Sequence, residues 1–219
     1  MTRINSPISV ASNALGILLR PTLPIGLGNT SPYSIIGSTI SNDGASACNR
    51  NIGTSTTPIA ATGLVVGGES HIGDAVGIQA LADVVAAYNY FRALPQTGTL
   101  AGDLIGRTIL PGVLFAGAAL GNSGTVTFNA TGYPLEAQFV ILCDAAVGTA
   151  AASQMVLINC QPSQIVWAIL GAVTIATNSN IVGTVLSLAA IGLGVGAQCD
   201  GRLLSATAAV TLSANRVTT

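Results

Sequence analysis

Short apolar runs recur at a nearly constant interval in the second half of the chain. Three of them, at positions 173–175, 191–193 and 210–212, have the form apolar-small-apolar. A second marker, at positions 183–186 and 201–204, repeats in step with them. A constant period of about 18 residues is typical of a β-solenoid, in which each coil buries its apolar side chains and stacks its backbone on the next coil. The pattern therefore predicts a mostly β protein built as a parallel β-solenoid.

One stretch has helical periodicity instead. Asp74 is a residue type suited to cap the N-terminus of a helix, and Pro95 is suited to end one. Between them lies an apolar series at spacings of three, four and three, formed by Ile78, Leu81, Val85 and Tyr88. This predicts one helix over about residues 74–94, with an apolar face that packs on the solenoid.

The start of the chain differs from the rest. Residues 1–26 contain Pro7, Pro21 and Pro24, which disfavour a continuous helix. We expect an extended N-terminal arm over residues 1–26, followed by one domain over residues 27–219. Apolar residues of the arm alternate in part, as in a strand added to a neighbouring subunit; they are Ile8, Val10, Leu15, Ile17 and Leu19.

Charge is sparse. Only 7% of the residues are charged, and seven Arg, eight acidic residues and no Lys give a net charge of −1. A basic patch for nucleic acids or anionic membranes is therefore not expected. The most apolar region, at positions 165–197, is interrupted by the polar positions 177–180. Neither part reaches the roughly 20 residues of a membrane-spanning helix, so no span is predicted.

The single histidine, His71, stands beside Glu69, Ser70 and Asp74, a set that invites comparison with a hydrolytic site. The same residues suit local hydrogen bonding at the start of the helix, which is the interpretation we prefer. The glycines of residues 192–196 lack the third glycine of a dinucleotide-binding fingerprint. We therefore expect neither an enzyme nor a bound cofactor.

Four cysteines are the remaining candidates for chemistry: Cys48, Cys143, Cys160 and Cys199. They lack Cys-x-x-Cys spacing and only one histidine could join them, so no metal site is expected. An even number permits three intramolecular pairings, and burial as small apolar side chains is the alternative. Cys143 and Cys160 are separated by nearly one coil period and could stack in adjacent coils. Cys48 and Cys199 could pair within or between subunits.

An ordered set of motifs resembles a known family: HIGDA at residues 71–75, LPGV at 110–113, VLIN at 156–159, GRLL at 201–204 and AVTL at 209–212. Together they are similar to the ice-binding-protein-like domain, and the resemblance covers roughly residues 27–216. It implies a discontinuous right-handed β-solenoid with triangular coils, flanked by one long helix.

The resemblance also implies a functional face. Ice-binding members present regularly spaced Thr, Ser and Asn on a flat side of the solenoid. The candidates for such a face in this chain are Thr174, Thr177, Asn178, Thr184 and Thr211. Members read something like TSITLNTGAT where residues 189–198 of this chain read AAIGLGVGAQ, so threonines are replaced at Ala189, Gly192, Val195 and Gln198. The threonine array is therefore thinned.

Three functions from different classes follow. The thinned array, the sparse charge, the arm and the cysteines favour a non-enzymatic structural subunit that self-assembles into an extracellular or spore-surface fibre or coat through its N-terminal arm and disulfides. The alternatives are an ice-binding protein that acts as an antifreeze or inhibits ice recrystallisation, and an adhesin-like surface module. The expected partners are other copies of the chain, in a homo-oligomer or filament, or ice. An extracellular or cell-surface location is expected, without a recognisable signal peptide.

Overall fold

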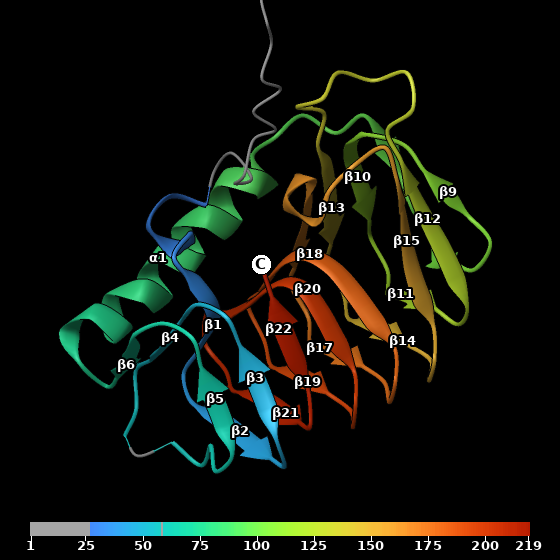
Figure 1. Ribbon diagram of the computed structural model, residues 1–219. Coiled ribbons are helices and arrows are strands. Elements are labelled where there is room, and N and C mark those ends of the chain that lie inside the picture. The colour runs from blue at the N-terminus through green and yellow to red at the C-terminus, as the bar shows by residue number, and fades with distance from the viewer. Residues whose placement is uncertain (1–26, 58) are drawn as a thin grey trace, which may run out of the picture.

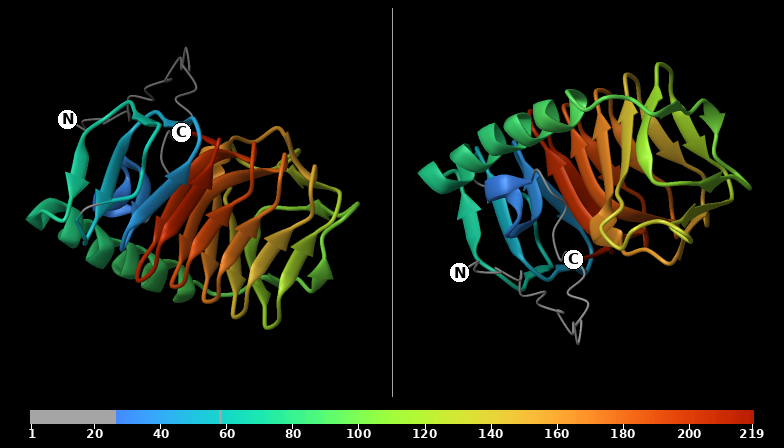
Figure 2. Two further views of the ribbon diagram at one scale, coloured as in Figure 1. Left: turned by 90° about the horizontal axis from the view of Figure 1, so that it is seen from below. Right: turned by 90° about the horizontal axis from the view of Figure 1, so that it is seen from above.

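A stack of short strands wound into coils beside one long helix dominates the computed structural model, which describes residues 27–57 and 59–219 (Figure 1). Every strand pairing in this part of the chain is parallel. Figure 2 shows the coils side by side along one axis, with the helix running along the stack. The prediction of a mostly β solenoid with one flanking helix is confirmed.

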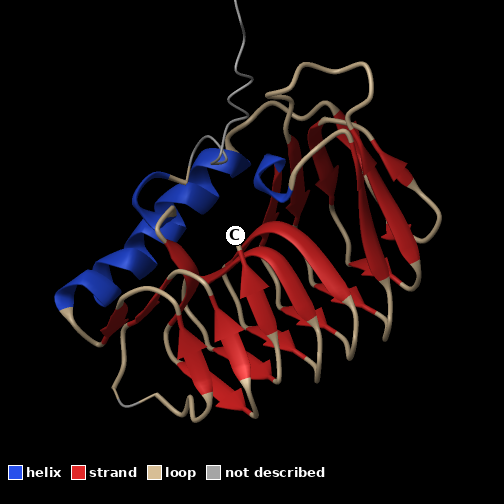
Figure 3. Ribbon diagram, in the orientation of Figure 1, coloured by secondary structure: helices blue, strands red, loops and turns tan. Residues whose placement is uncertain are grey.

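The strands form three sheets (Figure 3). The largest has twelve strands: β1 (Tyr33–Gly37), β3 (Ser46–Cys48), β4 (Asn51–Thr54), β5 (Leu64–Val66), β6 (Ser70–Ile72), β7 (Gly98–Thr99), β10 (Gly112–Ala116), β13 (Phe139–Cys143), β16 (Ile165–Ile169), β18 (Asn180–Ser187), β20 (Gln198–Ser205) and β22 (Arg216–Thr218). The second has seven: β2 (Ile40–Asp43), β8 (Gly102–Asp103), β11 (Leu120–Asn122), β14 (Val147–Thr149), β17 (Val173–Ile175), β19 (Ile191–Leu193) and β21 (Val210–Ser213). The third has three: β9 (Thr108–Ile109), β12 (Thr125–Asn129) and β15 (Gln154–Ile158).

The repeat in the sequence is the stacking register of the coils. Val173, Ile191 and Val210 begin β17, β19 and β21 and are register partners, as are Gly183 and Gly201 within β18 and β20. These two glycines have positive φ angles of 98° and 155°. A Cβ on Gly201 would lie 1.8 Å from the carbonyl oxygen of Gly183, so the close approach of the two backbones requires glycine.

The coils are not stacked in chain order. Strands β1, β2 and β3 pair with β20, β21 and β22, so the first described coil lies on the last one. The chain then follows α1 (Ala75–Arg92) to the far end of the stack and winds back from β7. Arg202 fixes the junction, because its buried Nε and Nη2 donate to the carbonyl oxygen of Ser31, beside the 3-10 turn η1 (Gly28–Thr30), at 3.3 and 3.1 Å. Burial lowers the pKa of this guanidinium to about 10.

Two apolar cores hold the fold together. The first fills the coils, and its centre is aromatic: the rings of Phe139 and Trp167 each meet that of Phe128 edge-on. The second lies between α1 and the large sheet, where helix residues such as Phe91 pack on strand residues such as Leu142. The second 3-10 turn, η2 (Pro162–Gln164), leads into β16.

The helix forms as predicted, but its buried face is different. Ile78 and Val85 are 52% and 37% exposed, whereas Leu81 and Tyr88 are buried. The residues that face the sheet are Gly77, Ala80, Leu81, Val84, Ala87, Tyr88 and Phe91. Three of them, Gly77, Ala80 and Ala87, have little or no side chain. A helical pattern identified from large apolar residues therefore does not include them. A Cβ on Gly77 would lie 2.4 Å from the carbonyl oxygen of His71, so the first turn lies directly on the backbone of the end coil.

The cysteines match the alternative of burial as small apolar side chains and not that of disulfide pairing. None of the four cysteines, all within the described residues, forms a disulfide, and all four are buried. Val217 lies between Cys199 and Cys48 in the register of neighbouring strands. Two strand spacings are roughly 9.5 Å, more than the roughly 7 Å that a disulfide spans between Cα atoms. Cys143 is not stacked on Cys160 either; its register partners are Ala116 and Ile169. The Cys160 thiol instead donates to the carbonyl oxygen of Phe128 at 3.4 Å.

We therefore expect a reducing agent to leave the melting temperature unchanged. Burial raises the pKa of the Cys48 thiol to about 11, and it also raises the pKa values of Cys143 and Cys199, so the thiolate forms are disfavoured. A thiol reagent should react fast with all four groups only after the protein is unfolded in denaturant. Fewer than four reactive thiols in the unfolded, unreduced protein would contradict the structure.

The residues proposed for an assembly arm, Ile8, Val10, Leu15, Ile17 and Leu19, lie outside the described residues. Within residues 27–57 and 59–219, no helix has both the length and the hydropathy that a membrane span needs.

Candidate functional site

The seven-stranded sheet presents a flat outer surface made of very small side chains. In β11, β17, β19 and β21 the first and third residues are buried and the middle residue is more exposed, as in Val173-Thr174-Ile175. In β14, Val147 is buried and Gly148 and Thr149 are partly exposed. The outward residues of successive strands are register partners and form a central row: Gly121, Gly148, Thr174, Gly192, Thr211 and Ser41. We call the outer surface of β11, β14, β17, β19 and β21, with the alanine before each strand, the small-residue face.

A ladder of alanines flanks the central row. The carbonyl oxygens of Ala146, Ala172, Ala190 and Ala209 accept hydrogen bonds from the residue that opens the strand of the preceding coil, at 2.9–3.1 Å. The alanines are therefore stacked in the same register as the strands they precede, and their methyl groups form a row along the solenoid axis. Sequence reasoning missed this row, although an alanine before a β-branched residue at each repeat was a visible signal.

Charge is excluded from the small-residue face. Its five strands carry no ionisable side chain, and the nearest ones in the sheet are Asp103 on β8 at one end and Asp43 on β2 at the other. With parallel strands roughly 4.8 Å apart, the uncharged stretch measures about 19 Å between its outer strands. The twelve-stranded sheet differs, since its exposed residues include Gln198 on β20 and Arg216 on β22.

The structure separates the predicted ice-face residues. Thr174 and Thr211 are exposed at the centre of the small-residue face. Thr177 and Asn178 are exposed in the turn after β17, beside the face rather than on it. Thr184 was wrongly assigned, because it is fully buried. It pairs with Val166 of the core under α1, since the long strand β18 has already turned the corner at Gly183.

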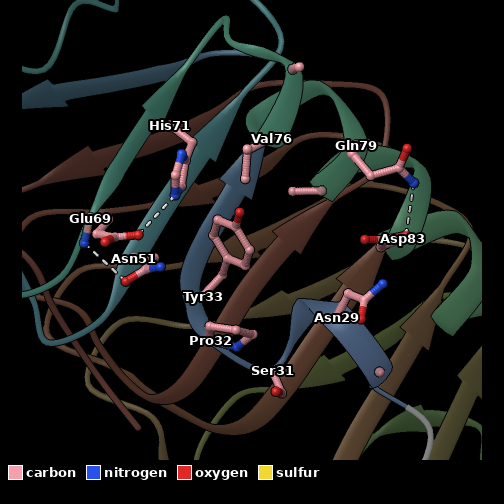
Figure 4. Close-up of a pocket in the computed structure, with 13 residues that line it drawn as sticks. Asn29, Ser31, Pro32, Tyr33, Asn51, Glu69, His71, Val76, Gln79 and Asp83 are labelled. Atoms are coloured by element: carbon pink, nitrogen blue, oxygen red, sulfur yellow. Dashed lines mark hydrogen bonds and ion pairs between the residues drawn. The ribbon is translucent and has the colours of Figure 1, made fainter.

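His71 lies in a separate feature, a cleft of about 630 Å³ between the start of α1 and strands β4 and β6 (Figure 4). Its Nε2 is 3.3 Å from a carboxylate oxygen of Glu69, and its Nδ1 is 3.1 Å from Asp74. The other oxygen of Asp74 accepts the backbone N–H of Gly77 at 2.7 Å and caps the helix. Both nitrogens of His71 are thus engaged with carboxylates, which supports the interpretation as a helix start.

Two aspartates should make stability depend on acidity. The pKa of Asp74 is lowered, first by the N–H of Gly77 and then by His71, and that of Asp103 is lowered, first by hydrogen bonds to Ser123 and then by the N–H of Ile105. Groups with a lowered folded pKa contribute stability above the ordinary carboxyl pKa of about 3.9 and lose it as the pH falls below that value. The melting temperature of the unaltered protein, measured between pH 7 and pH 2, should fall at the acid end. In the Asp74→Asn and Asp103→Asn variants the melting temperature should fall less steeply over the same range. Melting temperatures that decrease equally with falling pH in the unaltered protein and in both variants would contradict the stabilising role of these two carboxylates.

The family model described as Ice-binding-like matches residues 35–218. The chain belongs to the ice-binding-like family. An ice-binding protein of Nostoc sp. (strain HG1) is 33% identical over 197 residues, which are 87% of this chain and 72% of that protein. Ice-binding protein 1 of Shewanella frigidimarina (strain NCIMB 400) is 32% identical over 146 residues, 64% of this chain but 16% of that protein. The crystal structure of the ice-binding protein from the Antarctic ascomycete Antarctomyces psychrotrophicus gives a TM-score of 0.84 at 30% identity, covering 88% of this chain and 96% of that one.

Membership of the ice-binding-like family corrects the leading hypothesis from the sequence. The self-assembling fibre or coat is wrong, because the family, the relatives and the structural neighbours are ice-binding proteins. Its covalent element fails as well, since the cysteines that were to cross-link the subunits are buried thiols.

Proposed function

We propose that this protein binds ice through the small-residue face and thereby slows the growth and recrystallisation of ice. The observation that carries the proposal is the uncharged, in-register array of methyl, hydroxyl and glycine positions on five adjacent strands. Membership of the ice-binding-like family and the names of its relatives support the same function.

The chemistry of the face suits a ligand that consists of ordered water. Methyl groups, such as those of the alanine ladder, order the water around them without binding it, and the hydroxyl groups of Thr174 and Thr211 hydrogen-bond to it. An ionised side chain would hold its own strongly bound hydration shell instead. Because the rows are fixed by backbone hydrogen bonds, little conformational entropy is lost when a crystal surface is bound.

The proposal includes a non-enzymatic role with ice as the partner, acting outside the cell, where growing crystals meet the protein. Membership of the ice-binding-like family, whose named relatives are ice-binding proteins, supports the non-enzymatic part.

The direct test is the growth of single ice crystals in a solution of the purified protein. We expect faceted crystals and a gap between the melting and freezing temperatures, with serum albumin at equal concentration as the control. Because the chain has no lysine, an amine-reactive dye labels only its N-terminal amino group, and fluorescence on an ice hemisphere then shows which planes are bound. Rounded, freely growing crystals at high protein concentration would overturn the proposal.

A further inference from the structure

The cleft beside the start of α1, which also contains His71, has a polar group without a partner. Tyr33 opens β1, packs its ring into the core between α1 and the large sheet, and is only 5% exposed. Its hydroxyl lines the cleft, and no described residue forms a hydrogen bond with it. Figure 4 shows this hydroxyl pointing towards Val76. Buried tyrosine hydroxyls usually have a hydrogen-bond partner, so the unpartnered one in a cleft points to a ligand.

Negative charge surrounds this hydroxyl. Glu69 and Asp83 line the cleft, none of the described residues that line it is an arginine, and Asp74 lies beside it as the cap of α1. In Figure 4 the carboxylates of Glu69 and Asp83 lie on opposite sides of Tyr33. The pKa of Tyr33 is raised, first by burial and then by the charges of Asp74, Asp83 and Glu69. Like charges gathered in a cleft attract a ligand of the opposite sign, which here is a cation.

The carboxylates are placed too far apart for a metal ion. In the part of the chain that the structure describes, no group of three or more His, Cys, Asp or Glu side chains could hold one. Glu69 and Asp74 contact opposite nitrogens of His71, and Asp83 accepts a hydrogen bond from Nε2 of Gln79 at 3.1 Å. Each carboxylate keeps free acceptor positions, because an ionised carboxyl group has about four lone-pair sites. A larger cation with several N–H donors can use these positions.

The remaining wall of the cleft is apolar. Ala75, Val76 and Ala80 line it from the helix, and Pro32 lines it beside Tyr33. Val76 is 51% exposed, so its side chain is available for contact with a ligand. The cleft volume of about 630 Å³ lies within the range of roughly 300–1,000 Å³ that is typical of small-molecule sites. The lining therefore suits a short alkyl chain that carries a cationic group.

We propose that this cleft binds a small primary ammonium compound, with the ammonium group at the Tyr33 hydroxyl between Glu69 and Asp83 and the alkyl chain against Val76. A primary ammonium group donates three hydrogen bonds, so it can bind the hydroxyl oxygen and a carboxylate together. Hydrogen bonds from a charged donor are the stronger kind. None of the lining residues belongs to the seven-stranded sheet, so the site is separate from the small-residue face and can be tested without ice.

His71 provides the probe for this site, because it is the only histidine of the chain and it lines the cleft. The protein is titrated with n-butylammonium chloride at pH 7, and the ring C–H signals of His71 in the NMR spectrum should shift until they reach saturation. Sodium butyrate carries an anionic group on a chain of similar length and should leave the signals in place, as should sodium chloride at equal ionic strength. Calcium chloride tests for a metal site and should not displace n-butylammonium.

Two variants test the contacts of the ammonium group. Tyr33→Phe removes a hydroxyl that has no partner in the protein, so the melting temperature should stay the same while the dissociation constant for n-butylammonium rises roughly tenfold. Asp83→Asn keeps an acceptor for Gln79 but loses the charge, and it should weaken binding to a similar extent. Glu136→Gln is the matched control, because it removes the charge of an exposed carboxylate far along the chain and should leave the dissociation constant unchanged.

Several results would overturn this inference. His71 signals that do not respond to n-butylammonium would show that the cleft does not bind it. An equal response to butyrate would show that apolar contact alone is responsible, and displacement by calcium would show a metal site instead. A loss of affinity in Glu136→Gln as large as those in Tyr33→Phe and Asp83→Asn would show that the overall charge of the protein attracts the cation and that the cleft does not.

Discussion

Replacement of Thr211 by tyrosine is expected to remove most of the ice-binding activity. Thr211 lies on β21 in the central row, between Gly192 and Ser41. A phenol ring at this position stands above the plane of the alanine ladder and holds a flat crystal surface away from the neighbouring coils. We expect the affinity for ice to fall roughly tenfold, which corresponds to about 1.4 kcal/mol, and most of the hysteresis to be lost with it. Hysteresis at several protein concentrations measures the effect.

Thr125→Tyr is the matched control for this variant. Thr125 is an exposed threonine at the start of β12, on the three-stranded sheet, and Val126 beside it is buried as Val210 is beside Thr211. The control therefore adds the same ring to the same kind of position on another face, and it should leave the hysteresis unchanged. Equal losses in both variants would mean that the ice contact does not lie on the small-residue face.

The sequence predicts the coils better than it predicts their order. The nearly constant spacing of the apolar runs anticipates the register of Val173, Ile191 and Val210, because strands stacked in register need nearly equal lengths of chain per coil. The pairing of Ile35 with Leu203 has no local signal, since the two residues are far apart in the chain and belong to different repeats. Only the family resemblance indicates that discontinuity.

The candidate site shows the same limit at the level of single residues. Thr174 and Thr184 have similar local contexts in the repeat, yet one is exposed and the other is buried. The difference arises at Gly183, where the strand bends onto the side that α1 covers. The number and spacing of threonines in the sequence do not show on which side of such a bend each residue lies. Nor do they include the alanines and glycines that make up most of the small-residue face.

The inference from the low number of charged residues to a self-assembling subunit fails for a related reason. Fifteen ionic side chains in the sequence are few for a soluble solenoid, and the deficit favours surfaces covered by other subunits. In the structure, β11, β14, β17, β19 and β21 form an uncharged surface between Asp43 and Asp103, and the three-stranded sheet of β9, β12 and β15 also carries no ionisable side chain. Composition reports how much charge is missing, whereas the arrangement of strands determines which surface lacks it.

Trp167→Ala is expected to cause the largest loss of stability. Trp167, the single tryptophan, is fully buried, its ring meets Phe128 at 5.9 Å, and its Nε1 donates to the carbonyl oxygen of Val182 at 3.0 Å. Removing a buried ring of this size costs about 3–5 kcal/mol, and the carbonyl oxygen left without a donor adds about 1–3 kcal/mol. Because the variant loses the only tryptophan fluorophore, unfolding in urea is best followed by far-ultraviolet circular dichroism.

Trp167→Phe separates the two contributions, because it keeps an aromatic ring against Phe128 but loses the donor to Val182. The loss of unfolding free energy in Trp167→Phe should be clearly smaller than that in Trp167→Ala. If Trp167→Ala unfolds with a free energy within about 1 kcal/mol of that of the unaltered protein, the role of the aromatic centre is contradicted. Trp167 lies in β16, the strand that precedes β17 and its Thr174. If the coil is held mainly by this ring, Trp167→Ala should lose hysteresis in step with its unfolded fraction, whereas Thr211→Tyr should lose it while fully folded. That contrast distinguishes a residue that builds the ice-binding face from one that contacts the ice.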